Sequence, residues 1–518
     1  MNRLFFKFHF MKYFFVGIGI ILGSCLREKE EVNVVEEDFC AQIHLDQEKK
    51  LSDYLAPFSD RMETQTGVYA LEEGDISMVS RAWLCEVAEK SIDIQYFIFS
   101  PDNIGLIAVD YLLRAADRGV TIRLLVDDIM VQASGEELLA LDAHPHFSIK
   151  IYNPTANIGK NLPEKIFSLT TDFRGFNQRM HNKTFLVDKK VVITGGRNVA
   201  DEYFDYDHEY NFRDRDVLLM GKTAREVEES FNEFWNSDLS VPIGDLVQGT
   251  NAEIKAEEKY ADLHQYACNP ENFWPQVREK IQGIPMAFQR IQESGELVWV
   301  EHLSFISDKP GKNDGEEGIQ GGGLCTDSLI SLIKKAKTSI YIQSPYLVTT
   351  ELSQQLFRAA IESGVEVKIL TNSLSSTDNL EAFSGYQRDR EILLDLGIHI
   401  HEFKPDASIR FKIMTSALQE NLDFTPIFGL HAKSMVIDQE IAVIGTFNLD
   451  PRSANLNTEC IAVIYDPTIG RNLHKAMVED LKPENAWEVT STFNPDKEAG
   501  RSKRFKLWLR GVVPKSIL

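Results

Sequence analysis

One motif occurs twice in this chain, and the repeat limits the possible folds more than any other feature. The segment "MHNKTFLVDKKVVITGGRN" covers residues 180–198, and "LHAKSMVIDQEIAVIGTFN" covers residues 430–448. Each motif position recurs after the same 250 residues (431 minus 181), as seen for His181 and His431, Lys183 and Lys433, Asp188 and Asp438, Gly195 and Gly445, and Asn198 and Asn448. A constant offset within 518 residues predicts two related domains.

The segments upstream of the two motifs are also alike. Residues 106–127 and 352–372 each read as an amphipathic helix, a glycine stop at Gly119 or Gly364, and a buried strand. Helices that alternate with strands predict an α/β fold with layers around a sheet. The expected organisation is an extension at 25–67, a first domain at 68–250, a connecting segment at 251–323, a second domain at 324–490 and a tail at 491–518. Within the connecting segment, the glycine-rich and acidic run at 307–323 is expected to be a surface loop or linker.

The repeated motif carries groups that suit chemistry at a phosphodiester. Both copies predict a β-hairpin that turns at Asp188 or Asp438, and residues two apart on a strand share a face, as His181 and Lys183 do. One histidine can attack phosphorus, the other can protonate the leaving oxygen, and the lysines can hold the non-bridging oxygens. Asn198 and Asn448 can add hydrogen bonds to the same phosphate. The chemistry requires no cofactor and no metal.

The duplicated pattern H-x-K-x4-D-x6-G-[GST]-x-N resembles the phospholipase D superfamily. The resemblance covers most of the chain outside the N-terminal extension and the linker. It implies two α/β/α sandwich domains, produced by duplication, with one active site at their interface. It also implies a covalent phosphohistidine intermediate on His181, with His431 as the acid. The sequence itself leaves the order of the two histidines open.

The carboxylates near the motifs divide into two expected roles. In an extended segment Asp188 lies about 7 × 3.3 Å from His181, so the motif aspartates are expected to hold the hairpin turn rather than the histidines. The orienting carboxylates must come from elsewhere. Glu459 fits the acidic position that the superfamily has downstream of the second motif. Asp214 is its counterpart by position in the first copy, with Asp216 as a competitor.

The two copies differ at one position of the motif. The first has Gly196 where the second has Thr446. The first copy therefore lacks a hydroxyl group, and we expect the two halves to contact a phosphate differently.

The segments around the motifs, among them "GGRNVADEYF" (195–204) and "GTFNLDPRSANLNTE" (445–459), resemble those of bacterial cardiolipin synthases. The resemblance is strongest to the type that joins phosphatidylglycerol to a second phospholipid such as phosphatidylethanolamine. This implies a phosphatidyl transferase acting at a membrane surface. A phospholipase D hydrolase that releases phosphatidic acid would share every catalytic residue and remains an alternative. A nuclease is more remote, since a net charge of -23 opposes binding to nucleic acid. A non-catalytic envelope protein is opposed by the intact histidines, lysines and asparagines.

The N-terminus reads as a targeting segment. An apolar run at residues 13–22 is short for a membrane span but suits a signal peptide. Leu22-Gly23-Ser24-Cys25 resembles a bacterial lipobox, which predicts a signal at 1–24 and lipidation at Cys25. The expected location is the bacterial cell envelope, lipid-anchored and facing the periplasm. An uncleaved anchor with an incidental cysteine is the alternative.

The remaining predictions concern the C-terminal tail, an acidic stretch with a nearby aromatic residue, and the cysteines. The basic and aromatic tail "SKRFKLWLRGVVPKSIL" suits either a lipid surface or a docked helix with a solvated charged face. The acidic stretch 201–210 is expected to be a solvated loop rather than a metal site, and Phe97 is expected to lie in the core. Among the cysteines, no zinc pattern is found, Cys85 and Cys460 are expected to be core thiols, and a disulfide among Cys40, Cys268 and Cys325 is left open.

Overall fold

The computed structural model describes residues 39–42, 49–131, 133–155, 158, 177–247, 256–272, 275–313, 321–414, 426–511 and 513–515. All of them belong to one compact unit, Asp38–Leu518. The predicted signal at 1–24 and the predicted lipidation site Cys25 lie outside the described residues. Within the described ranges, no helix is long and apolar enough to cross a membrane.

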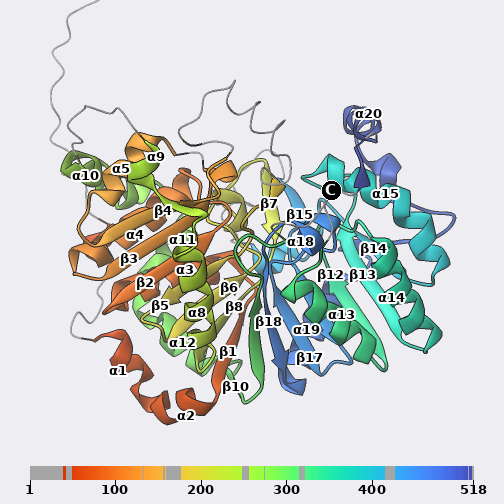
Figure 1. Ribbon diagram of the computed structural model, residues 1–518, viewed down its shortest axis with the longest axis horizontal. Helices are drawn as coiled ribbons and strands as arrows, with labels where there is room; N and C mark the ends of the chain where they lie inside the picture. Colours follow the sequence, from red (N-terminus) through yellow and green to blue (C-terminus); the bar gives the residue numbers. More distant parts are fainter. Residues whose placement is uncertain are drawn as a thin grey trace, which may run out of the picture. The chain divides into compact units, whose positions relative to one another are not determined.

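The first domain is built on a nine-stranded mixed sheet (Figure 1). Its strands, in spatial order, are β10 (Val298–Val300), β1 (Thr66–Leu71), β8 (Asp216–Gly221), β6 (Val191–Gly195), β5 (Thr184–Val187), β2 (Ser91–Tyr96), β3 (Thr121–Asp127), β4 (Phe147–Tyr152) and β9 (Ser240–Pro242). The neighbouring strands β2, β3 and β4, toward the β9 edge, are parallel, and they are connected by helices as the alternating pattern predicts.

The second domain repeats this arrangement in an eight-stranded sheet. Its order is β11 (Leu303–Ser307), β18 (Cys460–Tyr465), β17 (Ile441–Gly445), β16 (Ser434–Ile437), β12 (Ser339–Gln343), β13 (Glu366–Asn372), β14 (His399–Phe403) and β19 (Ala486–Val489). The hairpin strands β16 and β17 lie 250 residues after β5 and β6, as the motif offset requires. The predicted duplicated α/β fold is confirmed.

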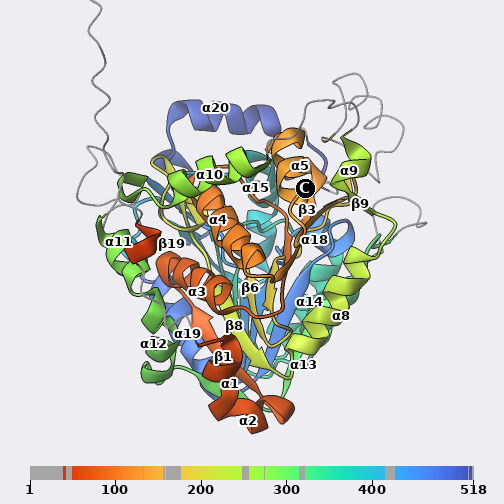
Figure 2. The same cartoon turned by 90° about the vertical axis from the view of Figure 1, so that its left-hand side faces the viewer.

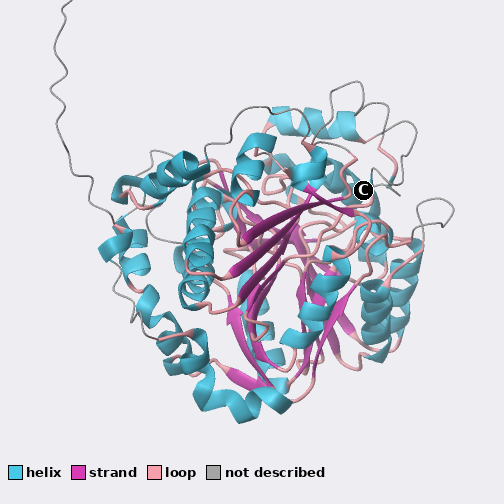
Figure 3. Ribbon diagram, turned by 60° about the vertical axis from the view of Figure 1, so that its left-hand side comes forward, coloured by secondary structure: helices cyan, strands magenta, loops and turns pink. Residues whose placement is uncertain are grey.

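Helices cover both faces of each sheet, so that each domain is an α/β/α sandwich (Figure 3). In the first domain α3 (Gly74–Val87) and α4 (Asn103–Asp117) cover one face, and α8 (Ala224–Trp235) covers the other. In the second, α13 (Leu324–Lys335), α14 (Glu351–Glu362) and α15 (Leu380–Asp395) lie opposite α19 (Pro467–Asp480). The other α-helices of the described residues are α1 (Leu51–Leu55), α2 (Ser59–Thr64), α5 (Gly135–Asp142), α9 (Ile243–Leu246), α10 (Ala256–Ala267), α11 (Pro275–Gln282), α12 (Ala287–Glu293), α16 (Arg410–Ile413), α18 (Pro451–Asn455) and α20 (Arg501–Arg510).

The motif hairpins turn where the sequence predicts. Asp188 and Lys189 both have positive φ values, 50° and 59°, as the central residues of a type I′ turn require, and Lys190 N–H closes this turn by donating to Val187 C=O. The Asp188 carboxylate accepts the backbone N–H groups of Glu89, Lys90 and Ser91 at 2.7–3.0 Å. Asp438 makes the equivalent contacts at the start of β12. The motif aspartates thus fasten each hairpin turn to the neighbouring strand.

The two domains share an apolar core. Side chains from the faces that carry α8 and α19 form one buried cluster, which includes Val192 and Leu219 of the first domain and Val436 and Ile444 of the second. In addition, β15 (Ile427–Leu430) of the second domain pairs in parallel with β7 (Tyr210–Arg213) of the first. A continuous apolar interface with backbone pairing makes a rigid boundary between the domains.

The connecting segment 251–323 is more structured than the expected linker. It supplies β10 to the first sheet and β11 to the second. Asp308 and Lys312, at the start of the predicted surface loop, are buried and form an ion pair of 2.8 Å. The expectation of a surface loop is wrong for Asp308 and Lys312, because these charges neutralise each other and the Lys312 ammonium donates to two backbone carbonyl groups, whereas Lys309 between them is exposed.

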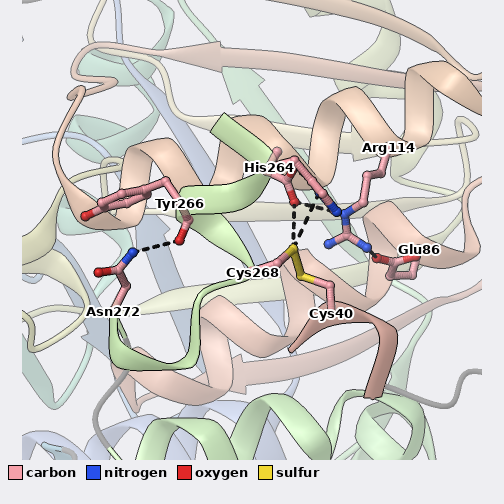
Figure 4. Close-up of a disulfide and its surroundings, with 8 residues drawn as sticks. Cys40, Glu86, Arg114, His264, Tyr266, Cys268 and Asn272 are labelled. Carbon is pink, nitrogen blue, oxygen red and sulfur yellow. Dashed lines mark hydrogen bonds and ion pairs between the residues drawn. A yellow bond between two sulfur atoms is a disulfide. The ribbon is translucent and has the colours of Figure 1, made fainter. Parts of the chain in front are cut away.

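A disulfide joins Cys40 to Cys268, which follows α10 (Figure 4). It fastens the N-terminal extension to the first domain, because α10 packs on α4. Asp110 lies close enough to both sulfurs for these three groups to be the one possible metal-ligand cluster in the described part of the chain, but the disulfide occupies both thiols. Cys85 and Cys460 are buried free thiols, as predicted, and so is Cys325.

Candidate active site

The two motif histidines stand at the boundary between the domains, each facing a carboxylate from the opposite half. His181, just before β5, places Nδ1 2.8 Å from Glu459 Oε2 in the second domain. Backbone hydrogen bonds bring His181 close to Glu459, because His181 N–H donates to Thr458 C=O at 2.9 Å and Thr458 N–H donates to Arg179 C=O. The first histidine is therefore oriented by the second domain.

The second histidine repeats this geometry in the opposite direction. His431 follows β15, and its Nδ1 lies 2.6 Å from Asp214 Oδ2 of the first domain. Pairing of β15 with β7 sets this contact, since His431 N–H donates to the carbonyl of Arg213, the residue before Asp214. The two histidine–carboxylate pairs are thus crossed between the domains.

Strand register explains why Asp214 and Glu459 correspond. Gly195 pairs with Asp216 in the first sheet, and Gly445 pairs with Ile461 in the second. Asp214 and Glu459 each stand two residues before these partners. The competitor Asp216 has a different role, because its carboxylate binds Arg81 at 2.9 Å.

The electrostatics of the pairs fix the state of each imidazole. Burial acts to raise the pKa of Asp214 and Glu459, but the adjacent histidine carries the pKa of each below its ordinary value. An ionised carboxylate only accepts hydrogen bonds, so Nδ1 of each ring must carry the proton. Burial lowers the pKa of both histidines against the pull of these carboxylates. Each neutral ring therefore has its lone pair on Nε2.

The motif lysines place two positive charges beside the histidines. Lys183 and Lys433 are both buried, and each donates from Nζ to the backbone carbonyl of its own motif histidine. Lys433 Nζ also lies 3.1 Å from His431 Nε2. Burial lowers the pKa of Lys183 to about 7 and that of Lys433 to about 8, and each lysine lowers the pKa of the other domain's motif histidine. The two motifs therefore act on one site.

The motif asparagines are buried but differ in their contacts. Asn198 Oδ1 accepts the backbone N–H of Ile98 at 3.1 Å. Asn448 Oδ1 has no hydrogen-bond partner among the described residues, although it is buried. A buried amide oxygen without a partner costs free energy and can accept from a hydroxyl group of a substrate, whereas only the amide N–H of Asn448 could donate to a phosphate oxygen.

The difference between Gly196 and Thr446 follows from the lengths of the two carboxylate side chains. A Cβ atom at residue 196 would lie 2.1 Å from Asp214 Oδ1, so only glycine fits there. In the second half the longer Glu459 leaves room for Thr446, whose hydroxyl donates to Glu459 Oε2 at 2.5 Å. The Thr446 hydroxyl thus supports the carboxylate, in place of the expected contact with phosphate.

Aromatic residues around the histidines were not predicted from the sequence. Phe97 packs edge-on against His181 with ring centroids 5.1 Å apart, so it is half-buried at the site rather than in the core. Tyr203 and Phe212 pack against His431 at 5.1 and 4.7 Å. Tyr203 belongs to the stretch 201–210, whose residues 203–206 are buried, so the expected solvated loop is wrong there. For Tyr203, the sequence feature that could have indicated burial was the run of tyrosine and phenylalanine residues among the acidic residues of 201–210.

Buried charges connect the site to both domains. Arg213 and Arg215 flank Asp214, and both bind Glu72 at 2.6 Å. Arg213 also reaches Asp480 of α19, and Arg215 donates to Gln343 Oε1 of β12. On the other side, Asp308 accepts the backbone N–H of Glu459. These contacts fix the backbone on which the orienting carboxylates stand.

The lysines predict an alkaline limit to activity. A lysine is charged below its pKa, so kcat/KM for a phosphodiester should fall as the pH rises through about 7 to 8. A water-soluble short-chain phospholipid at constant ionic strength would give this profile without a lipid surface potential. In Lys183→Arg, whose side chain stays charged, the limb near pH 7 should vanish and the limb near 8 should remain. A wild-type profile that is flat to pH 10 would contradict the role of the lysines.

The duplicated fold and the paired His-x-Lys motifs define a protein of the phospholipase D class. A family model described as "Cardiolipin synthase, PLD-like domain" matches residues 84–235 and 329–481. The chain belongs to this family of phospholipase D-like proteins, and it is a phospholipid-modifying enzyme.

Individual relatives agree with this family. The chain is 30% identical over 441 residues to "Cardiolipin synthase C" of Escherichia coli (strain K12), which covers 85% of this chain and 90% of that protein. It is 32% identical over 422 residues to an uncharacterized protein of Helicobacter pylori, covering 81% and 80%. The crystal structure of a phosphatidylserine synthase from Haemophilus influenzae Rd KW20 matches with a TM-score of 0.58 over 90% of this chain and all of that chain. At 12% identity, this last match shows a common fold alone.

Proposed function

We propose that the chain is a phosphatidyl transferase of cardiolipin-synthase type that works through a covalent phosphohistidine. The observation that carries the proposal is the crossed pair of imidazoles, each held at Nδ1 by an ionised carboxylate, with two buried lysines beside them. Two oriented imidazoles can act as nucleophile and general acid–base on one phosphorus atom. The relative named cardiolipin synthase C supports this substrate class.

In the first step of the proposed reaction, Nε2 of His181 attacks the phosphorus of a donor phospholipid. The bond from phosphorus to the head-group oxygen breaks. His431 is neutral in the free site; the bound anionic phosphodiester favours its protonation at Nε2, and this proton passes to the head-group oxygen. Lys183 and Lys433 stabilise the charge that develops on the non-bridging oxygens, and Asn448 can donate a further hydrogen bond. Asp214 and Glu459 position the two rings and stabilise the imidazolium form.

In the second step a glycerol hydroxyl of phosphatidylglycerol attacks the phosphohistidine. Its proton passes to His431, the bond between phosphorus and Nε2 of His181 breaks, and cardiolipin leaves. With phosphatidylethanolamine as donor the released head group is ethanolamine, and with phosphatidylglycerol it is glycerol. One phosphodiester is exchanged for another, so the proposed reaction consumes no nucleotide and uses no cofactor.

The proposed location is the bacterial cell envelope, where a lipid anchor at Cys25 holds the protein on a membrane surface that faces the periplasm. The lipobox-like Leu22-Gly23-Ser24-Cys25 supports the anchor. The disulfide between Cys40 and Cys268 supports an oxidising compartment, since such bonds are rare where thiols are kept reduced.

The product of the purified full chain tests the proposed activity. In vesicles of phosphatidylglycerol, with and without phosphatidylethanolamine, mass spectrometry should detect cardiolipin, together with ethanolamine release when phosphatidylethanolamine is present. Phosphatidic acid without cardiolipin would make the enzyme a hydrolase. Absence of both products would contradict the proposal. A His181→Ala preparation is the matched blank.

A further inference from the structure

The C-terminal helix α20 is the most basic short segment of an otherwise acidic chain. Its sequence "RSKRFKLWLR" contains five lysine and arginine residues and no acidic residue, whereas the whole chain carries a net charge of -23. It packs against α15 at the edge of the second domain, where Figures 1 and 2 both draw it. Its charge therefore differs in sign from that of the body that carries it.

One face of α20 docks on the domain through specific contacts. Lys503 donates from Nζ to the backbone carbonyls of Ser375 and Thr377 at 3.0 and 2.8 Å. Leu507 is buried, and Arg510 forms an ion pair of 2.8 Å with Glu381. These positions are spaced as i, i+4 and i+7, so they form one stripe of the helix. The helix is thus held in a fixed orientation.

The opposite face of α20 is apolar and exposed. Phe505, Trp508 and Leu509 are 61%, 73% and 51% exposed, and the rings of Phe505 and Trp508 stack at 6.0 Å. No other large hydrophobic side chain in the described ranges is as exposed as Trp508. Exposed Arg501 and Arg504 flank these rings. Aromatic residues between cations, on a helix docked by its other face, are typical of a segment that lies in a lipid interface.

The position of α20 relates this face to the active site. Lys433 precedes Ser434, which pairs with Gln343, the last residue of β12. Strands β13 and β14 run parallel to β12 and end at the same edge, where the loop that binds Lys503 begins. In that loop the Asp378 carboxylate accepts a hydrogen bond from the Tyr346 hydroxyl at 2.8 Å. It also interacts electrostatically with both Lys433 and Lys503. One loop therefore separates α20 from a motif lysine.

A second exposed aromatic residue lies at this edge. Phe411 of α16, in the segment that follows β14, is 62% exposed and is followed by exposed Lys412. Since β13 and β14 end at the same edge, α16 and α20 both project from the side of the sheet that carries the motif lysine.

We propose that Phe505, Trp508 and Leu509 of α20 insert into the interfacial layer of an anionic phospholipid bilayer and hold the active site against it. The inference rests on the proposed function for its substrate, but it concerns a surface that takes no part in the chemistry. The acidic body is repelled by anionic lipid, so the basic helix supplies the local attraction, and the aromatic rings supply the apolar contact.

A fluorescent probe at the helix tests the insertion without depending on turnover. The full chain carrying Trp508→Cys, labelled with an environment-sensitive maleimide, is mixed with vesicles of phosphatidylglycerol or of phosphatidylcholine. The free cysteines that the structure describes are buried, so labelling is directed to residue 508, with labelled wild type as the background. We expect emission to move to the blue and to rise at least about twofold on phosphatidylglycerol, and less on phosphatidylcholine.

Tyr465→Cys is the matched control, because Tyr465 is 45% exposed and pairs with Ile441 at the opposite edge of the same sheet. Its probe should not respond to vesicles. An unchanged spectrum at residue 508, or an equal change at residue 465, overturns the proposal.

Activity gives an independent readout of the same surface. In the Phe505→Ser/Trp508→Ser variant, turnover of lipid in vesicles should fall at least about tenfold, while turnover of a water-soluble short-chain phospholipid should stay at the wild-type level. Equal turnover of vesicle lipid by variant and wild type overturns the docking role. If wild type makes no lipid product, the proposed function fails, while the probe at residue 508 still tests the insertion.

Discussion

Replacing His181 or His431 by alanine should reduce turnover of phosphatidylglycerol by roughly 10⁴-fold or more in either case, since groups that act as one unit fail together. His181 has no substitute as the nucleophile, and His431 has none as the acid. The rate of cardiolipin formation in vesicles, followed by mass spectrometry, measures the loss. Both variants leave a cavity at a boundary held by many other contacts, so thermal unfolding should confirm that each remains folded.

The same two variants separate the roles of the histidines. A phosphatidyl ester of p-nitrophenol has a leaving group that needs no proton. With this substrate His431→Ala should release a burst of about one equivalent of p-nitrophenol and hold a phosphatidyl group on His181, whereas His181→Ala should release none. A burst from His181→Ala alone would exchange the two roles. Wild-type turnover by either variant on natural lipid would falsify the catalytic assignment itself.

Removing the orienting carboxylates should cost about 10³-fold in kcat, because an amide can present the wrong hydrogen-bonding group to Nδ1 and favour the wrong tautomer. Glu459→Gln should lose as much with the p-nitrophenyl ester as with natural lipid, since Glu459 serves the nucleophile. Asp214→Asn should lose less with the activated ester in the first step, since Asp214 serves the acid. The difference between the two substrates, measured by stopped-flow release of p-nitrophenol, checks the crossed pairing.

Asp216→Asn is the control for these substitutions. Its carboxylate is as buried as that of Asp214 but binds Arg81 and Ser77 in place of a histidine. We expect this variant to lower the melting temperature while kcat changes less than about tenfold at temperatures where it is folded. A loss in Asp216→Asn as large as that in Asp214→Asn would mean that general destabilisation, rather than imidazole orientation, explains both.

Much of the fold was predictable from local pattern. The hairpins β5–β6 and β16–β17 lie within short segments whose strands and turn are encoded by neighbouring residues, and the repeat offset carried the prediction from one to the other. The layers followed in the same way from amphipathic helices next to buried strands. Counting back from the end of the strand also reached Asp214 and Glu459 as equivalent positions, because strand register is preserved between the copies.

Contacts between distant segments were not predictable. The pairing of β15 with β7 decides which carboxylate meets which histidine, and nothing in either segment alone specifies its partner. For the same reason Cys40 and Cys268 could not be matched from spacing. The polar composition of 201–210 and 307–313 suggested solvated loops, but neighbouring elements bury Tyr203, Asp308 and Lys312, and a charge paired inside the fold looks the same in sequence as one in water.

The crossed pairs have a consequence for how the two halves can change. A histidine and the carboxylate that orients it are encoded on different repeats, so neither repeat contains a complete working set. A single repeat could complete the site only by associating with a second copy of itself. The exchange of glycine for threonine accompanies the exchange of Asp214 for Glu459 within the same repeat, so each repeat fits its own carboxylate while the histidine that this carboxylate orients belongs to the other repeat.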